Sequence, residues 1–303
     1  MNNFLIVLLG PTGVGKTDLS VCLAERLNCE IISADSRQFF REMKIGTAVP
    51  SDEQLIRVKH HFVRFLSIHD YYSTSRYERD VLALLPELFR NSRYALLSGG
   101  SALYIDAVCQ GMDDIPDVDP DIREKYIEMY RNEGVEGLRA ALKIADPEHY
   151  ARVDLKNHKR IIRALEICET TGRPYSSYLG KKKAERDFGI IKIGINRERA
   201  ELYQRINDRV DDMINSGLEE EASGLHTYRH LNALNTVGYK ELFEYFDGQV
   251  NLEKAIELIK RNSRRYAKRQ VTWWSRDKGI EWFGPGSTGE ILRFIKKQTE
   301  EHQ

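Results

Sequence analysis

The sequence predicts an α/β protein with a parallel sheet of the phosphate-loop type, flanked by helices and interrupted by an inserted all-helical lobe. Two observations lead to this class. Short apolar runs alternate with amphipathic stretches over the first 110 residues, which is typical of parallel strands covered by helices. A glycine-rich segment follows the first apolar run and precedes a helical pattern, as in phosphate-binding loops.

Three strands are expected before residue 110, at 4–9, 30–33 and 94–98. Each run is short and apolar, and small or turn-forming residues end it. Between them, residues 77–89 form the clearest helical pattern. Its apolar positions are Val81, Leu84, Leu85 and Leu88.

An acidic, proline-marked linker at 113–120 ends this alternation. From 122 to about 178 the patterns are helical, with breaks at Gly134, Pro147 and 172–174. We therefore expect two domains. They are a discontinuous core at 1–116 and 186–303, and a helical insertion at 117–185.

The lysines 181–183 are expected to lie in a solvated linker that leaves the insertion. A further strand is expected at 190–195, and only helices after it, including a long amphipathic helix from 252 to about 276.

The bulk composition is that of an ordinary globular protein. The 46 basic and 46 acidic residues balance, which argues against a protein that is basic all over but allows a local basic face. The four cysteines form no C-x-x-C pair, which favours a reducing compartment and a cytoplasmic location. The apolar run at 4–9 is too short for a membrane span, so no membrane association is expected.

The most informative segment is Gly10-Pro-Thr-Gly-Val-Gly-Lys16-Thr17, which fits G-x-x-x-x-G-K-[ST]. Glycines let successive backbone N–H groups point at phosphate oxygens, Lys16 supplies a positive charge, and the Thr17 hydroxyl can reach a bound Mg²⁺. The predicted phosphate-binding residues in this loop are Gly10, Thr12, Gly13, Val14, Gly15, Lys16 and Thr17.

Polar residues also follow the second and third strands. Asp35 is expected to face the phosphate loop, because ligands bind at the carboxyl ends of parallel strands. It is a candidate general base or Mg²⁺ ligand, or simply the N-cap of a following helix. After the third strand, two glycines permit close backbone approach. The Ser101 hydroxyl either donates to a phosphate or caps a helix.

Cations gather at three further places. Lys159 and Arg163 share a helix face beside Arg160, where Ile161 and Ile162 can pack inward. A charged helix face is more often simply solvated than bound to RNA or phosphate. Arg205 and Arg209 form a possible fork for a diphosphate, although ion pairs with nearby aspartates compete as an explanation.

The long C-terminal helix suggests a surface for a polyanion. Tyr266, Trp273 and Trp274 lie among its cations and either stack on bases or join the core, and at least one tryptophan is expected to be buried. The cations are Lys260, Arg261, Arg264, Arg265, Lys268, Arg269 and Arg276.

Six motifs, spread over most of the chain, resemble the tRNA dimethylallyltransferase (isopentenyl transferase) family. They are Gly10-Pro-Thr-x-x-Gly-Lys-Thr17, Asp35-Ser-x-Gln38, Ile45-Gly-Thr-Ala48, Gly99-Gly-Ser-x-Leu-Tyr104, Val237-Gly-Tyr-Lys-Glu241 and Arg265-Tyr-Ala-Lys-Arg-Gln-x-Thr-Trp273. The resemblance implies transfer of a dimethylallyl group from dimethylallyl diphosphate to the exocyclic amine of the adenosine 3′ to the anticodon. The acceptors would be tRNAs that read codons beginning with U. Diphosphate would be released, and the adenine would have to leave its stack to react.

The resemblance also implies roles for individual residues. Asp35 would be the general base, and Lys16, Arg209 and Thr17 with Mg²⁺ would stabilise the departing diphosphate. Ser101, where the family usually has threonine, would help to fix the substrates. The expected partners are the tRNA anticodon stem-loop and dimethylallyl diphosphate, and a monomer is expected. The implied tRNA-binding residues are Asp35, Ser36, Arg37, Gln38, Ser101, Arg123, Lys159, Arg160, Ile161, Ile162, Arg163, Val237, Gly238, Tyr239 and Lys240.

Two residues depart from the family pattern: Phe40 replaces a common tyrosine, and Val49 replaces a common lysine, so no phosphate contact is expected at Val49. Three alternative functions remain. A small-metabolite kinase would need arginines in a mobile lid over the γ-phosphate. An adenylate isopentenyltransferase would have little use for the insertion or the basic helix. An RNA-binding module without catalysis would not need Lys16, Thr17 and Asp35 together.

Overall fold

The computed structural model describes residues 3–113, 115–116, 118–180 and 184–301. The chain divides into two compact units, 1–110 with 185–303, and 111–184. The expected insertion at 117–185 differs from the second unit by a few residues at its start and by one at its end. The expected lysine linker at 181–183 lies outside the described residues.

The first unit contains a parallel sheet with the strand order β3-β2-β4-β1-β5-β6 in the described part of the chain. The strands are β1 (Phe4–Leu9), β2 (Ile31–Ser33), β3 (His60–His61), β4 (Tyr94–Gly99), β5 (Gly189–Ile195) and β6 (Ile280–Phe283). The strands predicted from the sequence are confirmed as β1, β2, β4 and β5. The expectation of only helices after residue 195 is wrong, because β6 pairs with β5 at the sheet edge.

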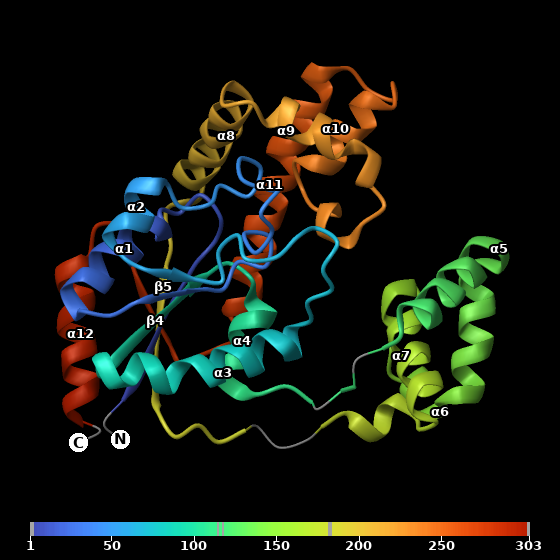
Figure 1. Cartoon of the computed structure of the whole chain (residues 1–303), viewed down its shortest axis with the longest axis horizontal. Coiled ribbons are helices and arrows are strands. Elements are labelled where there is room, and N and C mark those ends of the chain that lie inside the picture. Colours follow the sequence, from blue (N-terminus) through green and yellow to red (C-terminus); the bar gives the residue numbers. More distant parts are fainter. Residues whose placement is uncertain (1–2, 114, 117, 181–183, 302–303) are drawn as a thin grey trace. The chain divides into compact units, whose positions relative to one another are not determined.

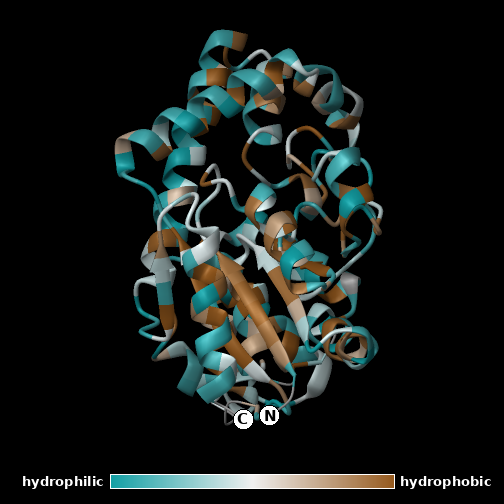
Figure 2. Ribbon diagram, turned by 90° about the vertical axis from the view of Figure 1, so that its left-hand side faces the viewer, coloured by the Kyte–Doolittle hydropathy of each residue, from teal (hydrophilic) through white to brown (hydrophobic). Residues whose placement is uncertain are grey.

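Helices cover both faces of this sheet (Figure 1). In β1, Phe4, Ile6 and Leu8 pack with α1 (Lys16–Leu27) and α12 (Thr288–Glu301). The alternate residues Leu5, Val7 and Leu9 pack with α3 (Thr74–Asn91) and α4 (Ala102–Gln110). Because both faces are covered, the whole strand is buried and apolar. Figure 2 shows the strands as hydrophobic ribbons between helices of mixed polarity.

A second group of helices in the same unit has its own apolar core. The group comprises α8 (Arg199–Asn215), α9 (Leu218–Leu225), α10 (Tyr239–Phe246) and the first part of α11 (Leu252–Trp274). The remaining short elements of this unit are α2 (Asp52–Arg57), η2 (His226–Tyr228) and η3 (Asn232–Leu234).

Helix α11 connects this group with the sheet. Near its start Ile259 belongs to the core of the helix group, whereas at its end Trp274 packs in the core beneath the sheet. Trp274 is buried, and its neighbour Trp273 is 45% exposed with its indole N–H donating to Asp106. The expectation that at least one of the tryptophans is buried is thereby confirmed.

The second unit is helical, with α5 (Pro120–Ala145), α6 (Pro147–Tyr150), α7 (His158–Thr171) and η1 (Tyr175–Tyr178). Helix α5 is interrupted at Gly134, where φ is +69°. At the expected break at Pro147, Asp146 connects the segments, because its carboxylate accepts hydrogen bonds from the N–H groups of His149 and Ser176. Ile161 and Ile162 lie in the core of this unit.

Candidate active site

The phosphate loop lies between the carboxyl end of β1 and the first turn of α1. Gly13 and Gly15 have φ values of +79° and +100°, a region that side-chain-bearing residues rarely adopt. A Cβ on Gly13 would also lie 2.8 Å from the Ile206 side chain. The loop therefore needs glycine at both positions to follow this path to the positive end of α1.

Lys16 is the first residue of α1, and its side chain reaches back into this loop. Its Nζ donates to the carbonyl oxygens of Gly10 (2.7 Å) and Pro11 (2.9 Å). Burial lowers the pKa of Lys16 to about 8, with the nearby Asp35 carboxylate raising it and Arg209 lowering it further. The ammonium group is thus held in a site where a second negative group would be strongly stabilised.

Gln270 ties the phosphate loop to helix α11. Its Oε1 accepts a hydrogen bond from the Thr12 N–H (2.9 Å), and its Nε2 donates to the Gly100 carbonyl (2.8 Å). Gln270 is 5% exposed, and its bond to the Gly100 carbonyl is buried. Gln270 belongs to one of the family motifs, but the sequence suggested no role for it. A local sequence pattern cannot predict a contact between Gln270 and Thr12, which are 258 positions apart.

The loops after β2 and β4 are fastened to each other. Ser101 Oγ accepts from the Ser36 N–H (3.0 Å), and the two serine hydroxyls are 3.1 Å apart. A Cβ on Gly99 would lie 2.2 Å from the Ala34 carbonyl oxygen, so only glycine permits this approach.

Asp35 does not cap a helix in this structure. Its Oδ1 accepts a hydrogen bond from the Arg37 N–H (3.2 Å), and a turn follows it. The helix-cap alternative for Asp35 is therefore wrong. Ser101 directly precedes α4, and its carbonyl accepts the first hydrogen bonds of that helix, as the helix-start alternative expects. Its hydroxyl, however, bonds with Ser36.

Three adjoining cavities lie around Asp35 and the phosphate loop. The largest, about 540 Å³, and a small one of about 80 Å³ share Thr12, Asp35, Arg209 and Tyr266 in their walls. The third, about 400 Å³, lies on the outer side of the phosphate loop and shares Lys16, Thr17 and Arg209 with the small cavity. Asp35 thus stands where the large cavity meets the small cavity at the phosphate loop. We call this place the Asp35 junction.

Arg209 reaches the junction from α8 and lines all three cavities. Burial lowers its pKa, and the Asp35 carboxylate partly offsets this effect. Arg205, one turn earlier, donates from Nε to the Gly13 carbonyl (3.1 Å). The competing ion-pair explanation receives no support from the described partners, because Asp208 bonds with Gln204 and Asp211 pairs with Lys260.

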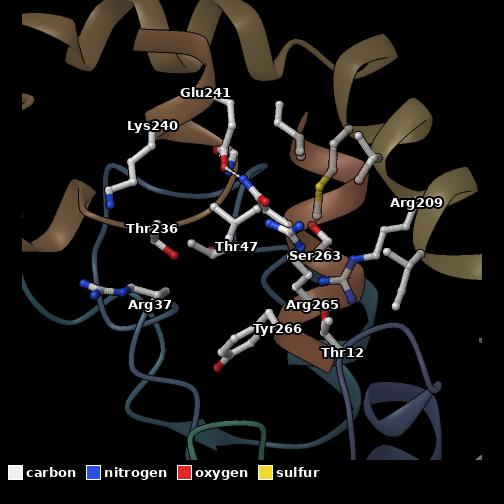
Figure 3. Close-up of a pocket in the computed structure, with 18 of the residues that line it drawn as sticks. Thr12, Arg37, Thr47, Arg209, Thr236, Lys240, Glu241, Ser263, Arg265 and Tyr266 are labelled. Atoms are coloured by element: carbon white, nitrogen blue, oxygen red, sulfur yellow. Dashed lines mark hydrogen bonds between the residues drawn. The ribbon is translucent and has the colours of Figure 1, made fainter. Parts of the chain in front are cut away.

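Cations and polar groups line the large cavity (Figure 3). Arg37 and Lys240 lie on one side of it, and Arg209 and Arg265 lie on the other. Tyr266 forms part of the wall shared with the small cavity, where burial raises the pKa of its hydroxyl to about 12. Its hydroxyl is therefore neutral and able to donate a hydrogen bond at pH 7.

The remaining predicted site residues of the first unit line one of two cavities. Ser36, Val237 and Gly238 line the large cavity, and Gln38 lines the small one. Gln38 also donates from Nε2 to the Thr47 and Ala48 carbonyls, which fixes the following loop.

Tyr239 does not present its side chain to a ligand. It is fully buried, and its hydroxyl donates to Glu221, which also accepts hydrogen bonds from the N–H groups of residues 44–46. The side chain therefore ties α10 to α9 through Glu221, and the implied role of Tyr239 in tRNA binding stays a prediction.

In the helical unit, Lys159 and Arg160 are exposed. Arg123 and Arg163 each place an Nη1 atom 3.4 Å from a carboxylate oxygen of Glu166, a residue with no exposed surface. The expected inward packing of Ile161 and Ile162 is confirmed, because both side chains are buried in the core of this unit. Their implied role in tRNA binding stays a prediction.

The fold and the site together define a class of α/β protein. In this class a carboxylate lies beside a phosphate-type loop, between a small cavity at the loop and a larger, cation-lined cavity. The IPP transferase family profile matches residues 38–277. The chain belongs to the IPP transferase family.

Individual relatives agree over nearly the full length. The chain is 54% identical to tRNA dimethylallyltransferase 1 of Bacteroides fragilis, covering 96% of this chain and 97% of that protein. It is 56% identical to tRNA dimethylallyltransferase 2 of Porphyromonas gingivalis, with the same shares covered. These matches also include the phosphate loop, which lies before the region matched by the family profile.

Solved structures show the same fold. The tRNA isopentenylpyrophosphate transferase of Bacillus halodurans superposes with a TM-score of 0.72 and 37% identity, covering 99% of this chain and 98% of that one. A eukaryotic dimethylallyltransferase acting on tRNA superposes with a TM-score of 0.76 and 25% identity, covering 93% of this chain and 74% of that one.

Among the described residues, none of the helices combines the length and the apolar character that a membrane span requires.

Proposed function

We propose that this protein transfers a dimethylallyl group from dimethylallyl diphosphate to the exocyclic amine of the adenosine 3′ to the anticodon. The acceptors are tRNAs that read codons beginning with U. The observation that carries the proposal is the Asp35 junction. It places one carboxylate between a phosphate loop and a cavity of about 540 Å³. The identities with proteins named tRNA dimethylallyltransferase support the same activity.

The reaction forms a C–N bond to the adenine amine and breaks the C–O bond to the diphosphate. Asp35 accepts the proton that the amine loses, because it is the carboxylate shared by the two cavities. Lys16, Arg209 and the loop N–H groups stabilise the charge that grows on the departing diphosphate. Ser101 holds the loop that carries Asp35 in place through its bonds with Ser36.

Magnesium fits this site as a companion of the diphosphate. No group of three or more His, Cys, Asp or Glu residues able to hold a metal occurs among the described residues. The Thr17 hydroxyl in the small cavity is an oxygen ligand of the kind Mg²⁺ prefers, and phosphate oxygens commonly complete its shell. When bound, the ion would supply further neutralisation of the leaving group.

The large cavity is the proposed entry for the extruded adenosine. Arg37, Lys240, Arg265 and Arg269 line it and would contact the RNA backbone, whereas the neutral Tyr266 is placed to touch the base. In the helical unit, Arg123, Lys159, Arg160 and Arg163 are proposed to bind the anticodon stem-loop.

We further propose that the protein acts as a monomer in the cytoplasm. Its four cysteines are free thiols, which suits a reducing compartment.

The test is incubation with radiolabelled dimethylallyl diphosphate and one acceptor at a time, with unmodified tRNA carrying A-A-A 3′ to the anticodon, or AMP. Label on tRNA supports the proposal, whereas label on AMP alone would indicate an adenylate isopentenyltransferase. Label on neither acceptor, together with phosphate transfer from ATP to a small metabolite, would indicate a kinase.

A further inference from the structure

The small cavity at the phosphate loop has a polar end and an apolar end. Lys16, Thr17 and Arg209 lie at the polar end, where the loop binds phosphate. Farther from the loop, Ile31 and His60 of the two neighbouring strands line it together with Pro50. An allylic diphosphate has the same division, with an anionic head and a hydrocarbon chain.

His60 is placed by the sheet itself. Strands β2 and β3 are parallel, and Ile31 is the register partner of His60, so the two side chains stand beside each other on the same face. Ser33, two residues after Ile31, shares that face and also lines the cavity. The row Ser33, Ile31 and His60 therefore forms a floor that leads away from the phosphate loop towards the sheet edge.

The imidazole ring of His60 is held in one orientation. Its Nδ1 lies 2.8 Å from the Val58 carbonyl oxygen, so Nδ1 carries a proton and donates it. Its Nε2 is buried and has no hydrogen-bond partner among the described residues. Burial lowers the pKa of His60, so the ring is neutral at pH 7.

Beyond this ring lies a separate hollow of about 370 Å³. Of the described residues, His60 is the one that lines both this hollow and the small cavity. Ile56, in the hollow's wall, is 85% exposed, so the hollow opens to solvent. The other residues that line the hollow are Leu55, Lys59, Val63 and Arg64.

We propose that His60 is the end wall of the compartment for the donor's hydrocarbon chain and restricts the enzyme to five-carbon donors. This inference rests on the proposed prenyl transfer. With the diphosphate at Lys16 and Thr17, a five-carbon group lies against Ile31 and Pro50 in a cavity of only about 80 Å³. A ten-carbon chain would collide with the ring, and removing the ring joins the cavity to the hollow behind it.

The test compares dimethylallyl and geranyl diphosphate as donors for His60→Ala, with His60→Leu as its matched control. Both variants lose the bond to Val58, but leucine keeps much of the volume of the ring. We expect His60→Ala to raise the ratio of kcat/KM for geranyl over dimethylallyl diphosphate by at least about 10-fold, the scale of one methylene in an apolar pocket. His60→Leu should stay close to the parent, as should Ile56→Ala at the open rim.

A binding measurement without tRNA gives a readout that does not depend on transfer. Calorimetry should show a higher affinity of His60→Ala than of the parent for geranyl diphosphate. The affinity for inorganic diphosphate should be the same in both proteins. An unchanged affinity for inorganic diphosphate also shows that the phosphate loop is intact.

The outcomes separate the two proposals. If the parent prenylates tRNA with the five-carbon donor but His60→Ala keeps the parental donor selectivity and geranyl affinity, the end-wall assignment is overturned and the proposed function stands. If His60→Leu broadens selectivity as much as His60→Ala, ring volume is not the cause, and the assignment is likewise overturned. If the parent transfers no prenyl group, the proposed function fails and the inference with it.

Discussion

At the scale of single residues, the chemistry depends on the charges that lie close to Asp35. Lys16 and Arg209 are both buried close to it, and its carboxylate raises the pKa of each against the effect of burial. One carboxylate therefore does two things: it serves as the proposed base, and it helps to keep two buried cations charged.

Replacing Asp35 with Asn tests the proposed base with little change in size. We expect kcat for tRNA prenylation to fall by about 100-fold or more, the range for loss of a general base, with tRNA affinity largely kept. The substitution also removes a charge that raises the pKa of Lys16, so the kcat of variant and parent is compared over a range of pH below the parental pKa of Lys16, about 8. A parental kcat in the Asp35→Asn variant would exclude Asp35 as the base.

The lowered pKa of Lys16 predicts a pH dependence of diphosphate binding. The charged form of lysine exists below its pKa, here about 8, so the attraction for an anion is lost as the pH rises through that value. In Lys16→Arg the guanidinium stays charged over this range. The affinity of the parent for inorganic diphosphate, relative to Lys16→Arg, should fall by up to about tenfold per pH unit above 8. Parallel profiles for the two proteins would contradict the assignment.

At the scale of elements, the site is held by side chains from elements that are distant in the sequence. Helix α11 supplies Gln270 to two loops and Tyr266 to the wall between the cavities, while α8 supplies Arg209. The geometry of the phosphate loop therefore depends on the position of α11, as well as on its own glycines.

Gln270→Ala tests this dependence. It leaves the Thr12 N–H and the Gly100 carbonyl without their buried partner, at a cost of about 1–3 kcal/mol for each such group. We expect a lower free energy of unfolding in urea and a raised KM for dimethylallyl diphosphate. Thr272→Ala, an exposed position on the same helix, serves as control and should change neither quantity. An unchanged KM in Gln270→Ala would show that the loop keeps its shape without the tether.

At the scale of the whole molecule, we propose that one unit carries out prenyl transfer and that the other binds the anticodon stem-loop. The unit of 1–110 and 185–303 contains the cavities, and the unit of 111–184 carries a cation face above its own apolar core. Each unit has its own core, so substitutions on the cation face should affect RNA binding without disturbing the Asp35 junction.

Arg160→Ala examines that division. Arg160 is exposed, so its removal should cost little stability but should weaken tRNA binding and lower the slope of log affinity against log salt by about one. The kcat at saturating tRNA should remain parental. Arg131→Ala, which removes an exposed arginine paired with Glu124 in the same unit, provides the control. If Arg160→Ala and Arg131→Ala have the same affinity and salt slope, the proposed RNA face is wrong.

The sequence predicted those parts of the fold whose signals are local. Strand β1 and the phosphate loop were readable because an apolar run, glycines and a lysine occur within 14 consecutive positions of the chain (4–17). Strands β3 and β6 were missed because they are short edge strands, defined by their partners rather than by their own periodicity.

By itself, then, the sequence determined the fold class, the phosphate loop, the cation-rich helices and the family. Only the tertiary structure decided that Asp35 stands between two cavities, that Gln270 bonds to a loop 258 positions away, and that Tyr239 is buried. The physical reason is that periodicity and turn chemistry act over a few residues. Burial and hydrogen bonding across a site depend on which distant segments the fold packs together.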